Sequence, residues 1–194
     1  NEVYIPPLVD WPAIIADPDK EICVTEGEGK AACACANGIP TLGLGGVDVW
    51  RSQERGLDML PALKQIVWKG RLVTIIYDSD AATNTNVLRA QRQLSDALLE
   101  LGAKPKVASL PSAPDGTKQG LDDYVLAAGV PALLEAIDSA EPPGEAHALW
   151  KLNEEVMYLR QEGLILVRDE GQLITPAAFT SHAFANRKYV EERF

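Results

Sequence analysis

The sequence has few of the residues that cross-link or metallate small proteins. Its 194 residues include only three cysteines and two histidines. An odd cysteine count without a secretory signal argues against a disulfide framework. Cys33 and Cys35, with one residue between them, lack the second cysteine pair or nearby histidine that would complete a zinc site. We therefore expect all three thiols, Cys23 included, to be reduced core side chains of a cytoplasmic protein.

Long apolar runs and an excess of positive charge are also missing. No segment approaches the roughly 20 apolar residues of a membrane helix, and the first residues lack the basic-then-apolar pattern of a signal peptide. Eighteen Lys and Arg against 28 Asp and Glu give a net charge of −10. This balance argues against membrane binding and against a sequence-independent coat on nucleic acid. The hydrophobic content of 46% excludes a disordered chain.

The pattern along the chain predicts one α/β domain with a parallel sheet flanked by helices. Apolar runs indicate strands at 22–25, 41–44, 72–77 and 106–110. Helical spacing indicates helices between and after them, at 30–36, 57–66, 86–101, 121–128 and 131–140. We expect residues 1–21 to be a lead-in and 22–140 to be the main domain. The start at Asn1 and the finish at Phe194 suggest a piece of a longer protein.

A small appendage is predicted beyond the break at Glu141-Pro142-Pro143-Gly144. Residues 145–194 are expected to hold a helix at 146–161 and a β-hairpin of strands 164–167 and 172–175.

Acidic residues follow the predicted strands where a parallel sheet gathers its ligands. Glu26 ends the first strand, and Asp78 and Asp80 follow the third. Because the carboxyl ends of parallel strands share one edge, these side chains are expected to meet, with Asp122 and Asp123 as further acids. Such a cluster suits a divalent cation. The alternative is that Asp78 and Asp80 cap a helix and Glu26 is a solvated loop residue.

Three better-known phosphate motifs fail when read letter by letter. A dehalogenase-type phosphatase would need Thr or Val two residues after Asp80, where Ala82 stands. A P-loop fails at both ends around Gly29-Lys30, and the dinucleotide fingerprint starting at Gly43 has Asp48 in place of its third glycine.

The motifs at the ends of the first and third predicted strands resemble those of a Toprim domain. The resemblance rests on a strand ending in Glu-Gly, within VTEGEGKAA at 24–32, and on a later strand ending in Asp-x-Asp, within IIYDSD at 75–80. The segments GIPTLGLGGV, YDSDAATNTNVLRA and KQGLDDY look like the Toprim-like type found in phage and plasmid primase-helicase proteins. The resemblance covers about residues 6–140 and implies a Rossmann-like parallel sheet.

The resemblance also implies roles for individual residues. Glu26 would be the general acid/base, and Asp78 and Asp80 would hold Mg²⁺, with Mn²⁺ as a substitute and with Asp122 and Asp123 as further acidic ligands. One departure is Lys30, which stands where the primase form often has an acid. It either contacts a phosphate, and so joins the catalytic set, or pairs with Glu26 or Glu28.

Further candidates for contact with nucleotide or nucleic acid lie outside the acidic set. They are Lys118, Asn86 and Arg51, the last beside Trp50. For each of them an ordinary surface or capping role is the alternative.

The function that follows from the resemblance is Mg²⁺-dependent nucleotidyl transfer in DNA replication priming. Its partners would be a single-stranded DNA template, nucleotides and a fused or associated helicase. Two alternatives stay open. One is a nuclease that hydrolyses phosphodiesters at the same acids, and the other is a non-catalytic module that binds metal or nucleic acid.

Overall fold

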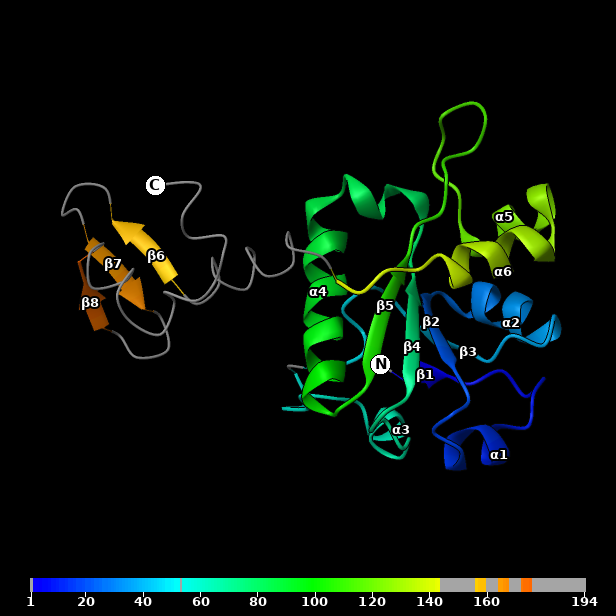
Figure 1. Cartoon of the computed structure of the whole chain (residues 1–194), viewed down its shortest axis with the longest axis horizontal. Helices are drawn as coiled ribbons and strands as arrows, with labels where there is room; N and C mark the ends of the chain where they lie inside the picture. Colours follow the sequence, from blue (N-terminus) through cyan, green and yellow to red (C-terminus); the bar gives the residue numbers. More distant parts are fainter. Residues whose placement is uncertain (1, 53, 144–155, 160–163, 168–171, 176–194) are drawn as a thin grey trace. The chain divides into compact units, whose positions relative to one another are not determined.

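A five-stranded sheet organises the first of two units into which the chain divides, Asn1–Pro143 and Gly144–Phe194. The structure is a computed structural model, and it describes residues 2–52, 54–143, 156–159, 164–167 and 172–175 (Figure 1). All candidate site residues lie in the first unit.

The sheet of this first unit is parallel except at one edge. Its strands are β1 (Val3–Tyr4), β2 (Ile22–Glu26), β3 (Thr41–Leu44), β4 (Leu72–Ile76) and β5 (Lys104–Ala108). Their order is β1-β3-β2-β4-β5, and only β1 runs antiparallel, against β3. The predicted α/β class with a parallel sheet flanked by helices is therefore confirmed. Because β2 and β4 are neighbours, their carboxyl ends share one edge.

Helices cover both faces of the sheet. They are α1 (Trp11–Ala16), α2 (Glu28–Ala36), α3 (Pro61–Lys64), α4 (Thr85–Glu100), α5 (Leu121–Ala128) and α6 (Val130–Asp138), with the 3-10 turn η1 (Ser79–Ala82). Alternate strand residues enter two separate cores. Val24 and Ile75 pack with α3 and α4 residues on one face, whereas Cys23 and Ile76 pack with α2, α5 and α6 residues on the other. Figure 1 shows α4 and the α2–α5–α6 group on either side of the strands.

The N-terminal segment is part of this unit, although the sequence indicated only a lead-in. β1 extends the sheet, and Trp11 and Ile14 of α1 are buried in the core. The side chain of Arg71 is fully buried, and its guanidinium donates to the carbonyls of Ile14, Ile15, Lys20 and Val67 at 2.6–3.0 Å. These bonds satisfy carbonyls at the end of α1 that have no helical partner.

Two predicted helices differ from the structure. The helix expected at 57–66 shrinks to the single turn α3, because Pro61 starts it and Leu60 before it is extended, a conformation that a following proline favours. The helix expected at 146–161 is wrong at 156–159, where Val156–Leu159 forms strand β6. β-branched and aromatic residues in that segment favour a strand. The rest of that expected helix lies outside the described residues.

The described part of the second unit is a three-stranded antiparallel sheet. Its order is β6 (Val156–Leu159), β7 (Leu164–Val167) and β8 (Gln172–Ile174). The strands β7 and β8 coincide with the predicted hairpin, so that prediction is confirmed. Among the helices within the described ranges, none has the length and apolar character needed to cross a membrane.

Candidate functional site

The candidate site lies at the carboxyl edge shared by β2 and β4. Thr25 is paired with Ile76, so Glu26 and Tyr77 continue side by side at this edge. The chain then turns through Asp78, Ser79 and Asp80 into η1. The sequence predicted that its first and third strands would end at one edge of the sheet, and the pairing of β2 with β4 confirms this.

The two acids that follow these strands point to different faces of the sheet. Side chains alternate between the two faces of a sheet, so Glu26 lies on the same face as Val24 and Tyr77. Asp78 lies on the other face, with Thr25 and Ile76. Burial, followed by the charges of Glu26 and Asp48, raises the pKa of the Tyr77 hydroxyl, which places both carboxylates near that ring. Glu26 therefore lies on the Tyr77 side of the edge, and Asp78 lies on the side of α2 and α5.

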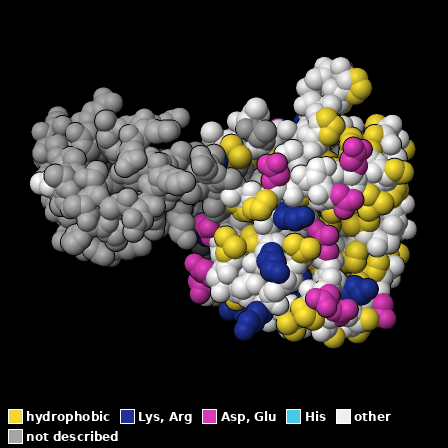
Figure 2. Space-filling view, in the orientation of Figure 1, with side chains coloured by type: hydrophobic (Ala, Val, Ile, Leu, Met, Phe, Trp, Pro, Cys, Tyr) yellow, Lys and Arg dark blue, Asp and Glu magenta, His cyan; other side chains and the backbone are white. Residues whose placement is uncertain are grey.

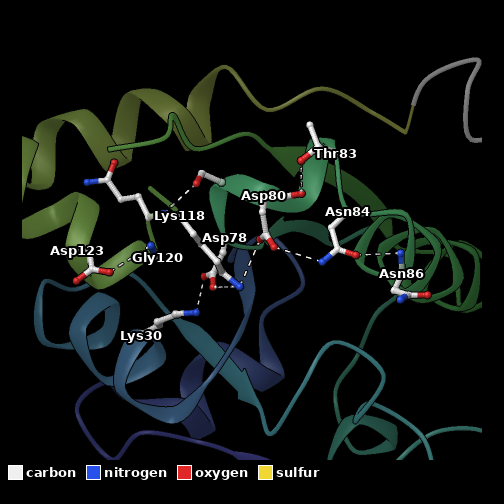
Figure 3. Close-up of polar contacts among 11 residues, drawn as sticks. Lys30, Asp78, Asp80, Thr83, Asn84, Asn86, Lys118, Gly120 and Asp123 are labelled. Carbon is white, nitrogen blue, oxygen red and sulfur yellow. Dashed lines mark hydrogen bonds and ion pairs between the residues drawn. The ribbon is translucent and has the colours of Figure 1, made fainter. Parts of the chain in front are cut away.

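Asp78 is nearly buried and is held by two lysines (Figure 3). Its Oδ1 contacts the ammonium of Lys30 from α2, and its Oδ2 lies 2.9 Å from the ammonium of Lys118. The same Lys118 nitrogen lies 3.4 Å from Asp80 Oδ1. The hydrogen bond to Asp78 is the main reason that the pKa of Lys118 is raised. Two carboxylates and two ammonium groups thus balance one another. The sequence suggested that Lys30 contacts a phosphate or pairs with Glu26 or Glu28, but in the structure it pairs with Asp78.

The loop that carries Lys118 is tied directly to the Asp-Ser-Asp turn. The Ser79 backbone N–H donates to the Gln119 carbonyl at 3.0 Å, and the Gln119 backbone N–H donates to Ser79 Oγ at 2.9 Å. These reciprocal bonds fix the end of the β5–α5 loop against η1. The Lys118 side chain is still 48% exposed, so it can leave Asp78 without unfolding the loop.

Gly120, at the start of α5, brings another acid near Asp78. A Cβ on Gly120 would lie 2.8 Å from Lys30 Cε, 2.9 Å from Asp122 Oδ1 and 3.3 Å from Asp78 Oδ1. Only a residue without a side chain leaves room for these three groups. Asp123 points elsewhere, because its Oδ2 accepts the backbone N–H of Gly120 at 3.4 Å and caps the helix.

The five acids that were expected to form one cluster do not gather at one point, but Asp78 and Asp80 are placed to share one divalent cation. Within the described ranges, no three His, Cys, Asp or Glu side chains are placed to hold a metal together. Asp78 and Asp80, however, both lie close to the one cationic nitrogen of Lys118. Asp80 Oδ1 is a buried atom that makes no hydrogen bond with any described residue. Mg²⁺ commonly takes one or two carboxylates and completes its shell with water and phosphate oxygens.

Among the described residues, the remaining predicted ones, Asn86 and Arg51, form no hydrogen bond or ion pair with Asp78 or Asp80, but Asn84 links Asp80 to the first turn of α4. Asn84 Nδ2 donates to Asp80 Oδ2 at 3.3 Å, and its Oδ1 caps α4 by accepting the N–H of Asn86. Asn86 itself is exposed in the first turn of α4. Arg51 has different neighbours, since it donates to Gln93 Oε1 at 2.6 Å and lies 3.6 Å from Asp48.

Sequence reasoning missed Asp48, Ser79 and Gly120. Asp48 follows the carboxyl end of β3, so the edge rule that selected Glu26 and Asp78 also applied to it. No sequence signal marks the pairing of Ser79 with the Gln119 backbone, because that contact depends on how the β5–α5 loop folds back.

Comparison with known proteins adds a family and two structures of similar arrangement. No curated protein matches the chain. The Aquifex aeolicus primase (zinc-binding and RNA polymerase domains) is 14% identical with a TM-score of 0.45, over 68% of this chain and 28% of that one. The E. coli primase catalytic core is 18% identical with a TM-score of 0.46, over 91% of this chain and 50% of that one. The chain thus spans half or less of the length of these structures.

A family model matches most of the first unit. It covers residues 10–132, which include every acidic and basic residue of the site described above. The chain therefore belongs to the family described as a domain of unknown function, DUF3854.

Proposed function

We propose that the first unit is a Toprim-like domain that catalyses metal-dependent nucleotidyl transfer in replication priming. One observation carries the proposal. At the edge where the Glu-ending strand and the Asp-x-Asp strand lie side by side, a single cationic nitrogen already has oxygen atoms of Asp78 and Asp80 at 2.9 and 3.4 Å. A divalent cation in that place would have the two carboxylate ligands that nucleotidyl transfer needs.

Mg²⁺, or Mn²⁺ in its place, would be held by Asp78 and Asp80, with Asp122 close enough to Asp78 to bind a metal-bound water. When bound, the metal neutralises charge that develops on the phosphate oxygens during in-line displacement. Asp123 is spent on capping α5, so it has no part in the proposed ligand set.

The lysines are proposed to bind phosphate oxygens. Lys30 and Lys118 now neutralise Asp78, and each becomes available when another cation takes their place. Lys30 lies in the first turns of α2, where backbone N–H groups also favour an anion. Together they would hold the phosphates of an incoming nucleotide against the edge of the sheet.

Glu26 is proposed to accept the proton of the primer 3′-hydroxyl as that oxygen attacks the α-phosphate of the incoming nucleotide, whose bond to the β-phosphate breaks to release pyrophosphate. Its place on the Tyr77 side of the edge separates it from the lysines, so no described ammonium group pairs with it. The Glu26 carboxylate is therefore left to accept a proton, whereas that of Asp78 is held by two ammonium groups.

The wider assembly belongs to the same proposal. A single-stranded DNA template and nucleotides would be the substrates, Asn86 would contact one of them, and a fused or associated helicase would be the partner. Residues 145–194 would connect the two modules. The net charge of −10 implies that most of the grip on template comes from outside this chain.

Primer synthesis on a single-stranded template with Mg²⁺ and nucleotides tests the proposal. The 194-residue chain, Glu26→Gln and Asp78→Asn are compared with two matched controls at exposed acids of α6, Glu135→Gln and Asp138→Asn. We expect the site variants to lose about 100-fold or more in rate and the controls to match the wild type. The proposal fails if the wild type makes no product or if both site variants make as much.

The same gel separates the alternatives. Shortening of labelled template that depends on Asp78 would assign a nuclease. Template binding without synthesis or cleavage would assign a non-catalytic module, which the full neutralisation of Asp78 by Lys30 and Lys118 favours as the second candidate.

A further inference from the structure

A polar cavity lies beside the edge of the sheet where β2 and β4 end, on the face opposite Asp78. It is a cavity of about 500 Å³ lined by the loop after β3 and by one side of α4. Tyr77 connects it to the edge, because its hydroxyl donates to the Val47 carbonyl at 3.2 Å and its pKa responds to both Glu26 and Asp48. The polar residues that line this arginine cavity are Asp48, Arg51, Ser52, Glu54, Arg89 and Gln93.

Arg51 is held in a fixed orientation at the wall of the cavity. Its guanidinium lies 4.8 Å from the centre of the Trp50 ring, and Nη2 donates to Gln93 Oε1 at 2.6 Å. Trp50 is 4% exposed, so its indole packs against the Arg51 guanidinium and is not accessible for stacking on a base. Ordering a guanidinium before a ligand arrives lowers the entropy cost of binding.

Arg89 reaches the same cavity from α4. Both arginines face Asp48, at 3.6 Å for Arg51 and 3.8 Å for Arg89. These separations exceed the 2.7–3.2 Å or so of a good N–H···O hydrogen bond. Consistently, Asp48 Oδ1 is buried without a hydrogen bond to any described residue. The two guanidinium groups are thus near one weakly engaged carboxylate, which a stronger acceptor would displace.

We propose that the arginine cavity binds a phosphate group, supplied by a nucleoside triphosphate or by a nucleic-acid strand. Arginine forks match phosphate oxygens in pairs, and charge-assisted bonds at 2.7–2.9 Å or so would replace the long contacts to Asp48. The site shares with the proposed function only the class of ligand. It needs neither a metal nor the acids Asp78 and Asp80.

On the face drawn in Figure 2, basic and acidic side chains are interspersed with apolar ones, without a broad basic stripe. The drawn face therefore offers no extended basic surface to a nucleic-acid strand.

Equilibrium binding in EDTA tests the proposal with the full 194-residue chain. Fluorescence anisotropy is measured for a labelled single-stranded oligonucleotide in one arm and a fluorescent ATP analogue in the other. We expect Arg89→Gln and Arg51→Gln each to weaken binding about five- to tenfold in at least one arm. For the oligonucleotide, each variant lowers the salt dependence of log K by about 0.7. Lys104→Gln, which removes an exposed charge at the amino end of β5, leaves binding unchanged.

A substitution of Asp48 distinguishes phosphate binding by the two arginines from a purely structural role in holding the loop. Asp48→Asn removes a negative charge that competes with the ligand, so binding tightens a few-fold, whereas Asp58→Asn in the same loop changes nothing. If the arginines only hold the loop through Asp48, the Asp48 variant weakens binding as the arginine variants do, and the proposal fails.

The two arms assign the ligand. Loss confined to the ATP arm identifies a nucleotide site, and loss confined to the oligonucleotide arm identifies a strand site. Absence of binding by the wild type in both arms, or unchanged binding by both arginine variants, overturns the proposal. Because EDTA removes the metal that the proposed catalysis needs, a failure of that catalysis leaves this binding result interpretable.

Discussion

Lys118, near the end of the β5–α5 loop, forms a 2.9 Å ion pair with Asp78 at the end of β4. The lysine is half exposed and the aspartate is nearly buried, so the pair joins a movable cation to a fixed anion. Any divalent ion that binds Asp78 and Asp80 must compete with this ammonium, because the same nitrogen is within 3.4 Å of Asp80. Metal affinity and the position of Lys118 should therefore be coupled.

The first prediction follows from that competition. Lys118→Met removes the competing charge and should raise the affinity for Mn²⁺ or Mg²⁺ about tenfold, since unit charges near 4 Å at a protein surface interact by about 1–4 kcal/mol. Titration calorimetry or Mn²⁺ resonance measures the change. Lys69→Met, at an exposed lysine outside the site, is the control. Unchanged or lower affinity in Lys118→Met would mean that the two carboxylates are not a metal site.

The second prediction concerns the room that Gly120 leaves. Gly120→Ala puts a Cβ within 3 Å of Lys30 Cε and Asp122 Oδ1, both at the ends of flexible side chains. We expect a stability loss of only about 1 kcal/mol but a clear loss of Mn²⁺ affinity, because the groups around Asp78 must move. Urea unfolding and metal titration measure the two effects.

Gly29→Ala is the matched control for that experiment. A Cβ on Gly29 meets nothing within 4 Å, and the residue lies inside α2. Alanine there should stabilise the protein by about 0.5–1 kcal/mol and leave metal binding as it is. A Gly120→Ala variant that binds metal normally would show that the close approach is not needed.

How far the sequence anticipates this site differs between its parts. The strands β2 and β4 are short apolar runs closed by Glu26 and Asp78, so their existence and their shared edge followed from pattern and topology rules. The face on which each acid lies did not follow. That depends on the pairing of Thr25 with Ile76, and a shift of one residue would put Glu26 and Asp78 on the same face.

Contacts between distant segments were also beyond the sequence pattern. Lys118 is one lysine among several until the loop folds back on Ser79, and Arg71 looks like a surface residue beside Gly70 until α1 packs over it. Both residues gain their role from partners far along the chain. The short α1 and β1 give too few residues for a periodic signal.

The third prediction tests the role of that buried arginine. Arg71→Met leaves four carbonyl groups without their donor, among them the last-turn carbonyls of Ile14 and Ile15. We expect the free energy of unfolding to fall by about 3 kcal/mol or more, since bonds to a charged donor contribute about 1.5–3 kcal/mol each. Urea unfolding measures it, with the exposed Arg55→Met as control. A loss below about 1 kcal/mol would mean that water satisfies these carbonyls.

The fourth prediction uses the thiols to report on Asp122. Cys23 and Cys35 are buried, whereas Cys33 is half buried on α2. Burial and then the charge of Asp122 raise the pKa of the Cys33 thiol. Cys33 should be the thiol that reacts with iodoacetamide in the native protein, and its rate should rise at higher pH than that of a free cysteine because only the thiolate attacks.

Asp122→Asn then gives the direction of the electrostatic effect. Removing the negative charge lowers the pKa of Cys33 toward its ordinary value, so the thiolate fraction at pH 8 increases and alkylation becomes faster. Mass spectrometry of the modified peptide measures the rate, and Asp123→Asn serves as the neighbouring control because that carboxylate caps Gly120 and does not act on Cys33. Equal rates in the wild type and Asp122→Asn would place the Asp122 carboxylate away from α2. It would then lie too far from Asp78 to assist a metal there.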